Sequence, residues 1–157
     1  MRIGFGYDAH RFQDDRKLVL CGIQIPFEKG LAGHSDADAA VHALIDAMLG
    51  ACALGDIGTH FPDSDAQYKD IDSMLLLERT VQILRDNGYA VHNTDITLVV
   101  QRPRLAKYIP QMRRKLADSL SIDITQVSVK AKTEEMLGFT GRGDGIKAYA
   151  VCAVEHL

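Results

Sequence analysis

Three residues in the first third of the chain offer nitrogen and oxygen donors of the kind that bind divalent metals. Asp8 and His10 lie two positions apart in a strand-forming run, so both side chains are expected on one face. His42 lies in a segment with helical periodicity. Three such ligands with a fourth position open are typical of catalytic zinc. Such residues often simply lie at the surface or form hydrogen bonds. The spacing alone favours these structural roles over metal binding.

Two carboxylates flank His42 on the same expected helix. Asp38, His42 and Asp46 are four positions apart and therefore share one helix face. A carboxylate one turn away could hold the second imidazole nitrogen of His42 and fix its tautomer. An exposed polar stripe explains the same spacing equally well.

Two polar segments near this helix are candidates for ligand contacts. His34, Ser35 and Asp36 stand where a loop enters the helix, where free N–H groups attract anions and where Ser35 or Asp36 could act as N-cap. A long polar loop follows over residues 55–70, and its short side chains suit either ligand contacts or ordinary turns. The loop residues singled out are Asp56, Ile57, Gly58, Phe61, Pro62, Asp63, Ser64 and Asp65.

A second polar group closes a strand near the C-terminus. Thr133 could cap a short helical turn and leave N–H groups free for a phosphate, with Lys132 adding positive charge. Glu135 could hold a magnesium ion that bridges phosphates. The glycine-rich stretch 138–145 lacks the Gly-Lys-Ser/Thr of a P-loop and precedes a strand, so a tight structural turn is expected there.

Hydrophobic periodicity places these residues on alternating strands and helices. The expected strands are 2–12, 17–20, 23–27, 91–101, 126–132 and 146–154, and the expected helices begin near Ser35 and cover 73–87 and 105–120. This order predicts an α/β (α+β) fold with a mixed four-stranded sheet, helices layered on one face and a small peripheral hairpin. The length fits a single domain over residues 1–157.

Composition limits the classes of partner. The chain has 157 residues, 46% of them hydrophobic, and a net charge of -3, which argues against duplex nucleic acid as the main partner. No apolar stretch approaches a membrane span and no secretory h-region is present. Cys21, Cys52 and Cys152 show neither metal nor disulfide spacing, as expected for buried thiols in a reducing compartment. We therefore expect a cytoplasmic protein without nucleic-acid or membrane partners, and a processed organellar form stays open.

Taken together, these segments resemble the 2-C-methyl-D-erythritol 2,4-cyclodiphosphate synthase family of the non-mevalonate isoprenoid pathway. Each motif is common by itself, and their joint occurrence in the family's order over nearly the whole chain carries the resemblance. The matching runs are Arg2-Ile3-Gly4, Asp8-x-His10, His34-Ser35-Asp36-x-Asp38, His42-Ala43-Leu44, Leu54-Gly55-Asp56-Ile57-Gly58, Phe61-Pro62-Asp63, Ile109-Pro110, Val129-Lys130-Ala131 with Thr133 and Glu135, and Leu137-Gly138-Phe139-Thr140-Gly141-Arg142-Gly143.

The resemblance implies an enzyme that cyclises 4-diphosphocytidyl-2-C-methyl-D-erythritol 2-phosphate and releases CMP. It implies a homotrimer with active sites at subunit interfaces, zinc on Asp8, His10 and His42, and magnesium or manganese near Glu135. It also implies that His34 and Thr133 stabilise the charge that develops during the reaction. The implied substrate contacts are Asp8, His10, His34, Ser35, Asp56 to Gly58, Phe61 to Asp65, Val100, Gln101, Arg102, Pro103, Arg104, Leu105, Ala106, Lys132 to Glu135, Phe139 and Arg142.

One segment departs from the family pattern. Many relatives carry consecutive threonines before the glutamate, whereas Lys132 and Glu134 flank Thr133 here, which leaves the roles of those two side chains unassigned. Two other function classes fit the residues: a metal-dependent phosphohydrolase of a nucleotide diphosphate, and a non-catalytic module that binds CDP or metal. Product analysis separates both from the cyclase.

Overall fold

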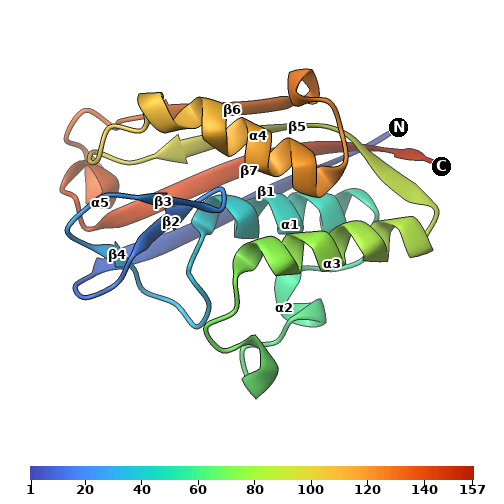
Figure 1. Cartoon of the computed structure of the whole chain (residues 1–157), viewed down its shortest axis with the longest axis horizontal. Coiled ribbons are helices and arrows are strands. Elements are labelled where there is room, and N and C mark those ends of the chain that lie inside the picture. Colours follow the sequence, from blue (N-terminus) through green and yellow to red (C-terminus); the bar gives the residue numbers. More distant parts are fainter.

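The computed structural model describes residues 1–157 and places helices against one face of a mixed sheet (Figure 1). Five strands form the sheet in the spatial order β4–β1–β7–β5–β6. They are β1 (Arg2–Gln13), β4 (Gly30–Leu31), β5 (Tyr89–Val99), β6 (Val127–Lys132) and β7 (Gly145–His156). β7 pairs antiparallel with β1 and β5, whereas β5 and β6 run parallel. The predicted mixed sheet is confirmed, with the two-residue β4 as an additional edge strand.

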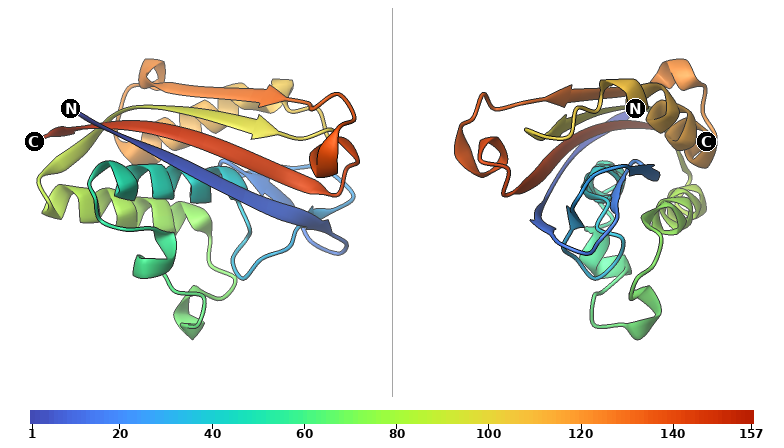
Figure 2. Two further views of the ribbon diagram at one scale, coloured as in Figure 1. Left: turned by 180° about the vertical axis from the view of Figure 1, so that it is seen from behind. Right: turned by 60° about the vertical axis from the view of Figure 1, so that its left-hand side comes forward.

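Three longer helices cover one face of the sheet, and the opposite face of β1 and β7 carries none (Figure 2). They are α1 (Ala39–Ala51), α3 (Ser73–Asp86) and α4 (Ile109–Leu120). The predicted peripheral hairpin is also present as a separate two-stranded sheet. The remaining elements are β2 (Leu18–Leu20), β3 (Ile23–Ile25), α2 (Ile57–His60), α5 (Gly138–Gly141) and the 3-10 turns η1 (Ala66–Tyr68), η2 (Ala106–Tyr108) and η3 (Ile124–Gln126).

Helix α1 packs directly on the backbone of β1 because two glycines face it. A Cβ atom on Gly4 would lie 1.9 Å from the Ala47 carbonyl oxygen, and one on Gly6 would lie 1.9 Å from the Ala43 carbonyl oxygen. Only glycine permits such an approach. The even-numbered positions of β1 therefore form the face that meets α1, and this face continues toward Asp8.

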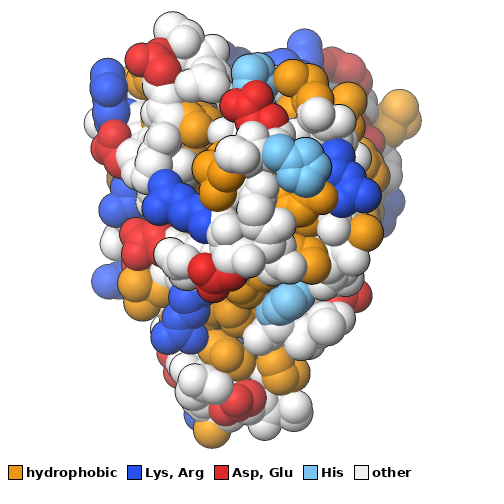
Figure 3. All heavy atoms as spheres, turned by 90° about the vertical axis from the view of Figure 1, so that its right-hand side faces the viewer, with side chains coloured by type: hydrophobic (Ala, Val, Ile, Leu, Met, Phe, Trp, Pro, Cys, Tyr) orange, Lys and Arg blue, Asp and Glu red, His pale blue; other side chains and the backbone are white.

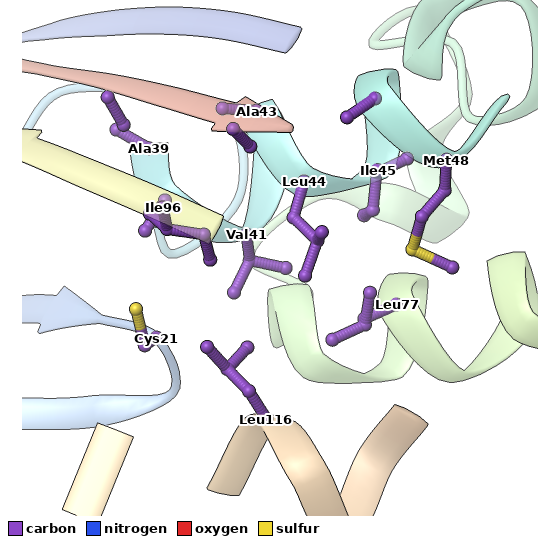
Figure 4. Packing of buried hydrophobic residues seen from close by; sticks show 14 of the residues in the cluster. Cys21, Ala39, Val41, Ala43, Leu44, Ile45, Met48, Leu77, Ile96 and Leu116 are labelled. Carbon is purple, nitrogen blue, oxygen red and sulfur yellow. The ribbon is translucent and has the colours of Figure 1, made fainter. Parts of the chain in front are cut away.

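The core lies between the sheet and the helices and joins 39 buried residues in one cluster. Val41 and Leu44 of α1 point toward Leu77 of α3 and Leu116 of α4, with Ile96 of β5 beside them (Figure 4). Leu44, Leu77 and Leu116 are fully buried. Each such leucine contributes about 1.5–3 kcal/mol through removal of apolar surface from water.

Two local expectations are corrected by the structure. The N-cap of α1 is Asp38, not Ser35 or Asp36, because its carboxylate accepts the Val41 N–H at 3.2 Å and Ala37 has a left-handed φ of 58° that separates the helix from the preceding loop. The stretch 138–145 is not a simple turn, since residues 138–141 form the short helix α5.

The surface mixes charges of both signs. On the end of the molecule that carries both chain termini, basic and acidic side chains are interspersed with hydrophobic ones (Figure 3). None of the helices has both the length and the low polarity needed to cross a membrane. The three cysteines are buried and unpaired, as the sequence predicted.

Candidate functional site

The three predicted metal ligands meet in the structure. Asp8 Oδ2 lies 2.8 Å from His10 Nε2 and 3.0 Å from His42 Nδ1, and the two ring nitrogens are 3.4 Å apart. Ligand atoms on a tetrahedral zinc ion, at about 2.0–2.1 Å from the metal, lie roughly 3.3 Å from one another. One carboxylate oxygen and two imidazole nitrogens at these separations fit a single small divalent cation with a further position open.

Backbone geometry explains why these residues converge. Asp8 and His10 follow Gly4 and Gly6 on the face of β1 that meets α1. His42 is in the first turn of α1, which begins after the Asp38 cap. The glycine contacts bring that helix close to the strand, so the first turn of α1 lies beside the polar end of β1.

The electrostatics of this group favour added positive charge. Burial alone would raise the pKa of Asp8, but hydrogen bonds and charge from His10 and His42 outweigh it and hold that pKa well below its usual range. Burial likewise opposes charging of His10, and its contact with Asp8 overcomes this and raises the His10 pKa. A half-buried carboxylate therefore draws a cation, either a proton on an imidazole or a metal ion.

Each imidazole has a partner for its second nitrogen. His10 Nδ1 is 2.6 Å from the Ala32 carbonyl oxygen, so Nδ1 carries the proton and Nε2 is free to bind a metal. His42 Nε2 is 2.9 Å from Ser73 Oγ and 3.2 Å from Ser35 Oγ. Such contacts orient metal-binding imidazoles.

The expectation that Asp38 or Asp46 holds the second nitrogen of His42 is wrong. Besides capping α1, the fully buried Asp38 accepts the N–H groups of Cys21 and Gly22 at 3.0 and 2.7 Å. Asp46 accepts the N–H of Ile57 at 2.8 Å, which anchors the start of α2. Both carboxylates satisfy backbone donors, and Ser73 and Ser35 take their place.

A cavity of about 380 Å³ opens beside the metal ligands. It unites most of the first predicted site: Asp8, His10, His34, Ser35, His42, Ile57, Gly58, Phe61, Pro62 and Asp63, together with Gly33, Asp46, Tyr68, Ile71 and Leu76. Apolar side chains between residues 57 and 76 meet polar groups from β1, α1 and the loop before α1, a combination typical of small-molecule sites. The loop over residues 55–70 therefore forms one wall of the candidate site.

Three predicted contacts from this loop do not line the cavity. Asp56 caps α2 by accepting the Thr59 N–H at 2.8 Å, and Asp65 caps η1 by accepting the Gln67 N–H at 3.0 Å. Ser64 lies exposed between Asp63 and Asp65. Two of the three therefore have a local role that shapes the loop.

The second predicted group lies elsewhere in the chain. Its residues before position 134, apart from Arg102, line a shallower cavity of about 180 Å³, which shares no residue with the first, and Glu134 and Glu135 line neither cavity. The lining residues are Val100, Gln101, Pro103, Arg104, Leu105, Ala106, Ala131, Lys132 and Thr133. Arg102 and Arg142 line a third cavity of about 310 Å³, and Phe139 lines none of the three. One chain therefore holds the two predicted halves of the site apart.

The turn after β6 uses its two glutamates differently. Glu134 accepts hydrogen bonds from Lys147 and Thr140, which lowers the pKa of the Glu134 carboxyl. Glu135 is exposed, with a left-handed φ of 51°, and its carboxylate accepts the Thr133 hydroxyl at 2.6 Å. Thr133 is not the cap of a helix, because residues 135 and 136 form only a turn.

Ser73 is the clearest residue that the sequence reasoning missed. It is the first residue of α3, where serine is ordinarily interpreted as part of a helix start. No spacing rule connects position 73 to position 42. Tyr68, Ile71 and Leu76 were missed for a similar reason, since apolar residues near a helix start are usually core.

Comparison with known proteins supports one family over the whole chain. The YgbB family model matches residues 1–155. A 2-C-methyl-D-erythritol 2,4-cyclodiphosphate synthase of Syntrophomonas wolfei is 59% identical over 156 residues, which cover 99% of each chain.

Solved structures agree. The chain superposes on the bifunctional IspDF of Campylobacter jejuni with a TM-score of 0.96 and 38% identity, covering 99% of this chain and 42% of that longer one. A 2-C-methyl-D-erythritol 2,4-cyclodiphosphate synthase bound to CDP gives a TM-score of 0.90 and 34% identity, with 98% and 100% coverage. The chain thus belongs to the YgbB family, the family of 2-C-methyl-D-erythritol 2,4-cyclodiphosphate synthases.

Proposed function

We propose that the protein converts 4-diphosphocytidyl-2-C-methyl-D-erythritol 2-phosphate to 2-C-methyl-D-erythritol 2,4-cyclodiphosphate and CMP, as a lyase of isoprenoid precursor biosynthesis. One observation carries this proposal beyond family membership. The Asp8, His10 and His42 group borders a cavity that is also lined by His34 and Ser35, two possible hydrogen-bond donors from the loop that enters α1. A metal and a phosphate can therefore be held side by side.

The reaction needs little proton transfer. An oxygen of the 2-phosphate attacks the β-phosphorus, an O–P bond forms, and the bond from the β-phosphorus to the oxygen of CMP breaks. Because the nucleophile is already an oxyanion, the barrier consists mainly of repulsion between anions and the entropy of ring closure. The residues of the site must therefore neutralise charge and hold the substrate folded.

The first cavity supplies the groups for the β-phosphate. A zinc ion on Asp8, His10 and His42, when bound, would polarise that phosphate as a Lewis acid. His34 and Ser35 would donate hydrogen bonds to its oxygens, and His34 would also stabilise the charge that develops during attack. The cavity wall from Ile57 to Asp63 would contact the erythritol and ribose portions.

The second group would complete the site with phosphate and cytosine contacts. Glu135 presents an exposed carboxylate that could hold magnesium or manganese, which would neutralise charge on the diphosphate when bound. Thr133 would donate its hydroxyl to a phosphate, exchanging its present acceptor on Glu135. Residues 100–106 would surround the cytosine, and Phe139 and Arg142 would contact substrate or another phosphate ligand.

Assembly as a cyclic homotrimer would join the two groups. Each subunit would present its metal group to the second group of a neighbour, in a heterologous ring interface. The helix-free face of the sheet supports this, because Ile3, Phe5, Tyr7 and Val151 expose 71, 64, 46 and 41% of their surface there. A monomer rarely exposes so many large apolar side chains together.

Product analysis tests the proposed function. The protein, with zinc and magnesium, is incubated with the phosphorylated cytidyl substrate, and the products are identified by mass spectrometry. The cyclase gives CMP and a cyclic diphosphate in equal amounts. A linear product that has gained water, or free phosphate, would instead establish the hydrolase, and binding of CDP without any turnover of the substrate would establish a binding module.

A cytoplasmic location is part of the proposal. Three buried free cysteines are typical of proteins in reducing compartments. Fractionation of the source cells with detection of the protein in the cytosolic fraction is the corresponding measurement.

A further inference from the structure

Ser73 links His42 to a carboxylate outside the metal group. His42 Nε2 lies 2.9 Å from Ser73 Oγ, and the Ser73 hydroxyl donates to Asp36 Oδ1. The other oxygen of Asp36 accepts the Ser73 N–H at 3.1 Å. We propose that Ser73, held by Asp36, is a positioning residue that fixes the tautomer and ring orientation of His42 for metal binding.

The number of protons available determines which atom donates in each of these hydrogen bonds. The carboxylate of Asp36 can only accept, so the single hydroxyl proton of Ser73 is directed to it. Ser73 Oγ can then only accept from His42, which requires the proton on Nε2. An imidazole with its proton on Nε2 can bind a metal through Nδ1, the atom that lies 3.0 Å from Asp8 Oδ2 and that donates a proton to this carboxylate when no metal is bound. Ser73 thereby directs the metal-binding nitrogen toward the ligand set.

Helix capping does not account for the Ser73 hydroxyl. The N-cap of α3 is Asp72, whose carboxylate accepts the Met74 N–H at 2.8 Å. Ser73 is fully buried, and its hydroxyl contacts only Asp36 and His42. The hydroxyl therefore serves Asp36 and the imidazole and takes no part in capping α3.

Ser35 cannot give the same control. Its Oγ lies farther from His42 Nε2, at 3.2 Å, and accepts the Ala37 N–H at 3.1 Å. No carboxylate fixes the hydroxyl proton of Ser35, which can rotate toward a ligand in the cavity that Ser35 lines. The two serines thus have different roles. Ser73 orients the imidazole, and Ser35 faces the cavity.

The same contacts join the loop that carries His34 to the start of α3. The Asp36 N–H donates to the Ile71 carbonyl at 3.2 Å, and the Asp70 N–H donates to the His34 carbonyl at 2.7 Å. Asp36 also accepts the Asp38 N–H at 3.2 Å. Replacing Asp36 would therefore disturb the loop as well as His42, so Ser73 is the residue to change.

The test is the zinc affinity of Ser73→Ala, and it rests on the metal assignment in the proposed function. Zinc dissociation constants are measured on the full-length protein by competition with a chromophoric chelator. Loss of an outer partner of a metal-binding histidine typically weakens binding by roughly 10–100-fold, and we expect that loss for Ser73→Ala. Ser73→Thr, which restores a hydroxyl, should recover most of the affinity.

A matched control lies on the same helix. Thr80 is fully buried in α3, and its hydroxyl bonds only to the Leu76 carbonyl of its own helix, at 2.8 Å. Thr80→Val removes a buried hydroxyl from α3 without touching His42, and it should bind zinc as the parent protein does. Thermal unfolding of the metal-free proteins identifies any variant that loses its fold.

A second readout follows the proton itself. In ¹⁵N-labelled protein saturated with zinc, long-range proton–nitrogen spectra should show His42 with its proton on Nε2 and none on Nδ1, and Ser73→Ala should speed the exchange of that Nε2 proton with water. Unchanged zinc affinity in a folded Ser73→Ala variant, or equal losses in Ser73→Ala and Thr80→Val, would overturn the role of Ser73. A parent protein that binds no zinc would refute the metal assignment instead.

Discussion

Glu134 and Lys147 form an ion pair at 2.5 Å that joins the turn after β6 to the beginning of β7. The side chains are 33 and 15% exposed, so the pair is partly shielded from water. Thr140 of α5 donates to the second oxygen of Glu134. Glu134, to which the sequence analysis assigned no role, therefore links the turn that carries Thr133 and Glu135 to α5 and β7.

The first prediction is that this ion pair positions the second half of the site. Glu134→Gln and Lys147→Met should each lower kcat/KM, and the double variant should lose less than the sum of the single losses. The difference between the double loss and the sum of the single losses measures the coupling between the two side chains. The exposed pair Lys130–Asp95 is the matched control, because it lies away from both cavities and should show no coupling in kcat/KM.

The second prediction concerns the metal. His42→Ala removes one of three ligands and should yield folded protein with little bound zinc and no turnover. Elemental analysis of purified protein measures the zinc content, and circular dichroism verifies the fold. An undiminished zinc content in this variant would rule out the assigned ligand set.

The third prediction concerns the proton balance of the reaction. If the attacking phosphate is already ionised, the acidic limb of the pH–rate profile should follow the second pKa of a phosphate monoester, which is roughly 6. Asp63→Asn removes the one carboxylate that the loop over residues 55–70 contributes to the cavity. It should lower the rate without changing the shape of the profile. Disappearance of the acidic limb would identify Asp63 as the titrating group.

The fourth prediction concerns the shared site. His42→Ala and Glu135→Ala should each be inactive. His42→Ala removes a ligand from the metal group of every site, and Glu135→Ala removes the carboxylate from the second group of every site. Random equal mixing in a cyclic trimer leaves roughly one site in four with both halves intact, so co-refolding should restore activity. Native mass spectrometry must verify that mixed trimers form. Mixed trimers without activity would show that each site is built within one subunit.

The fifth prediction concerns stability. Burial, with a contribution from the Asp36 charge, raises the pKa of Asp38 from 3.8 to about 6, although three backbone N–H donors oppose the shift. The folded state thus holds the proton more tightly than the unfolded state, and the free energy of unfolding falls as the pH rises from about 4 to about 6. In urea titrations, this fall should be smaller for Asp38→Asn, by at most about 3 kcal/mol.

The exposed Asp118 provides the control for that measurement, since Asp118→Asn should retain the pH dependence of the parent protein. Comparing the slopes cancels any constant loss that Asp38→Asn suffers from its altered hydrogen bonds. Parallel curves for the parent and Asp38→Asn would show that Asp38 ionises normally.

Sequence reasoning reached the parts of the structure that depend on local periodicity. Alternation along β1 was enough to place Asp8 and His10 on one face, and helical spacing placed His42 near them only once the family resemblance was used. The two-residue β4 was missed because so short a pairing leaves no pattern. The cap of α1 was misplaced because Ser35, Asp36 and Asp38 are all good capping residues, and only backbone geometry at Ala37 distinguishes them.

Contacts between segments that lie far apart in the sequence could not be predicted from the sequence. Ser73 meets His42 across 31 positions, and Glu134 meets Lys147 across 13, and neither spacing corresponds to a repeat of any secondary structure. Both contacts depend on how α3, α5 and β7 are packed. The two halves of the site raise a further difficulty, since a relation between subunits leaves no mark on the periodicity of one chain.

The glycine contacts between β1 and α1 make the spacing of the metal ligands a property of the main chain. Because Gly4 and Gly6 touch the carbonyl groups of Ala47 and Ala43, no side chain sets the distance between strand and helix. Substitutions that change the size of core side chains elsewhere would therefore leave Asp8 and His42 close together. A single-residue insertion between Gly6 and Asp8 would have the opposite effect, turning both strand ligands to the outer face and abolishing the site at once.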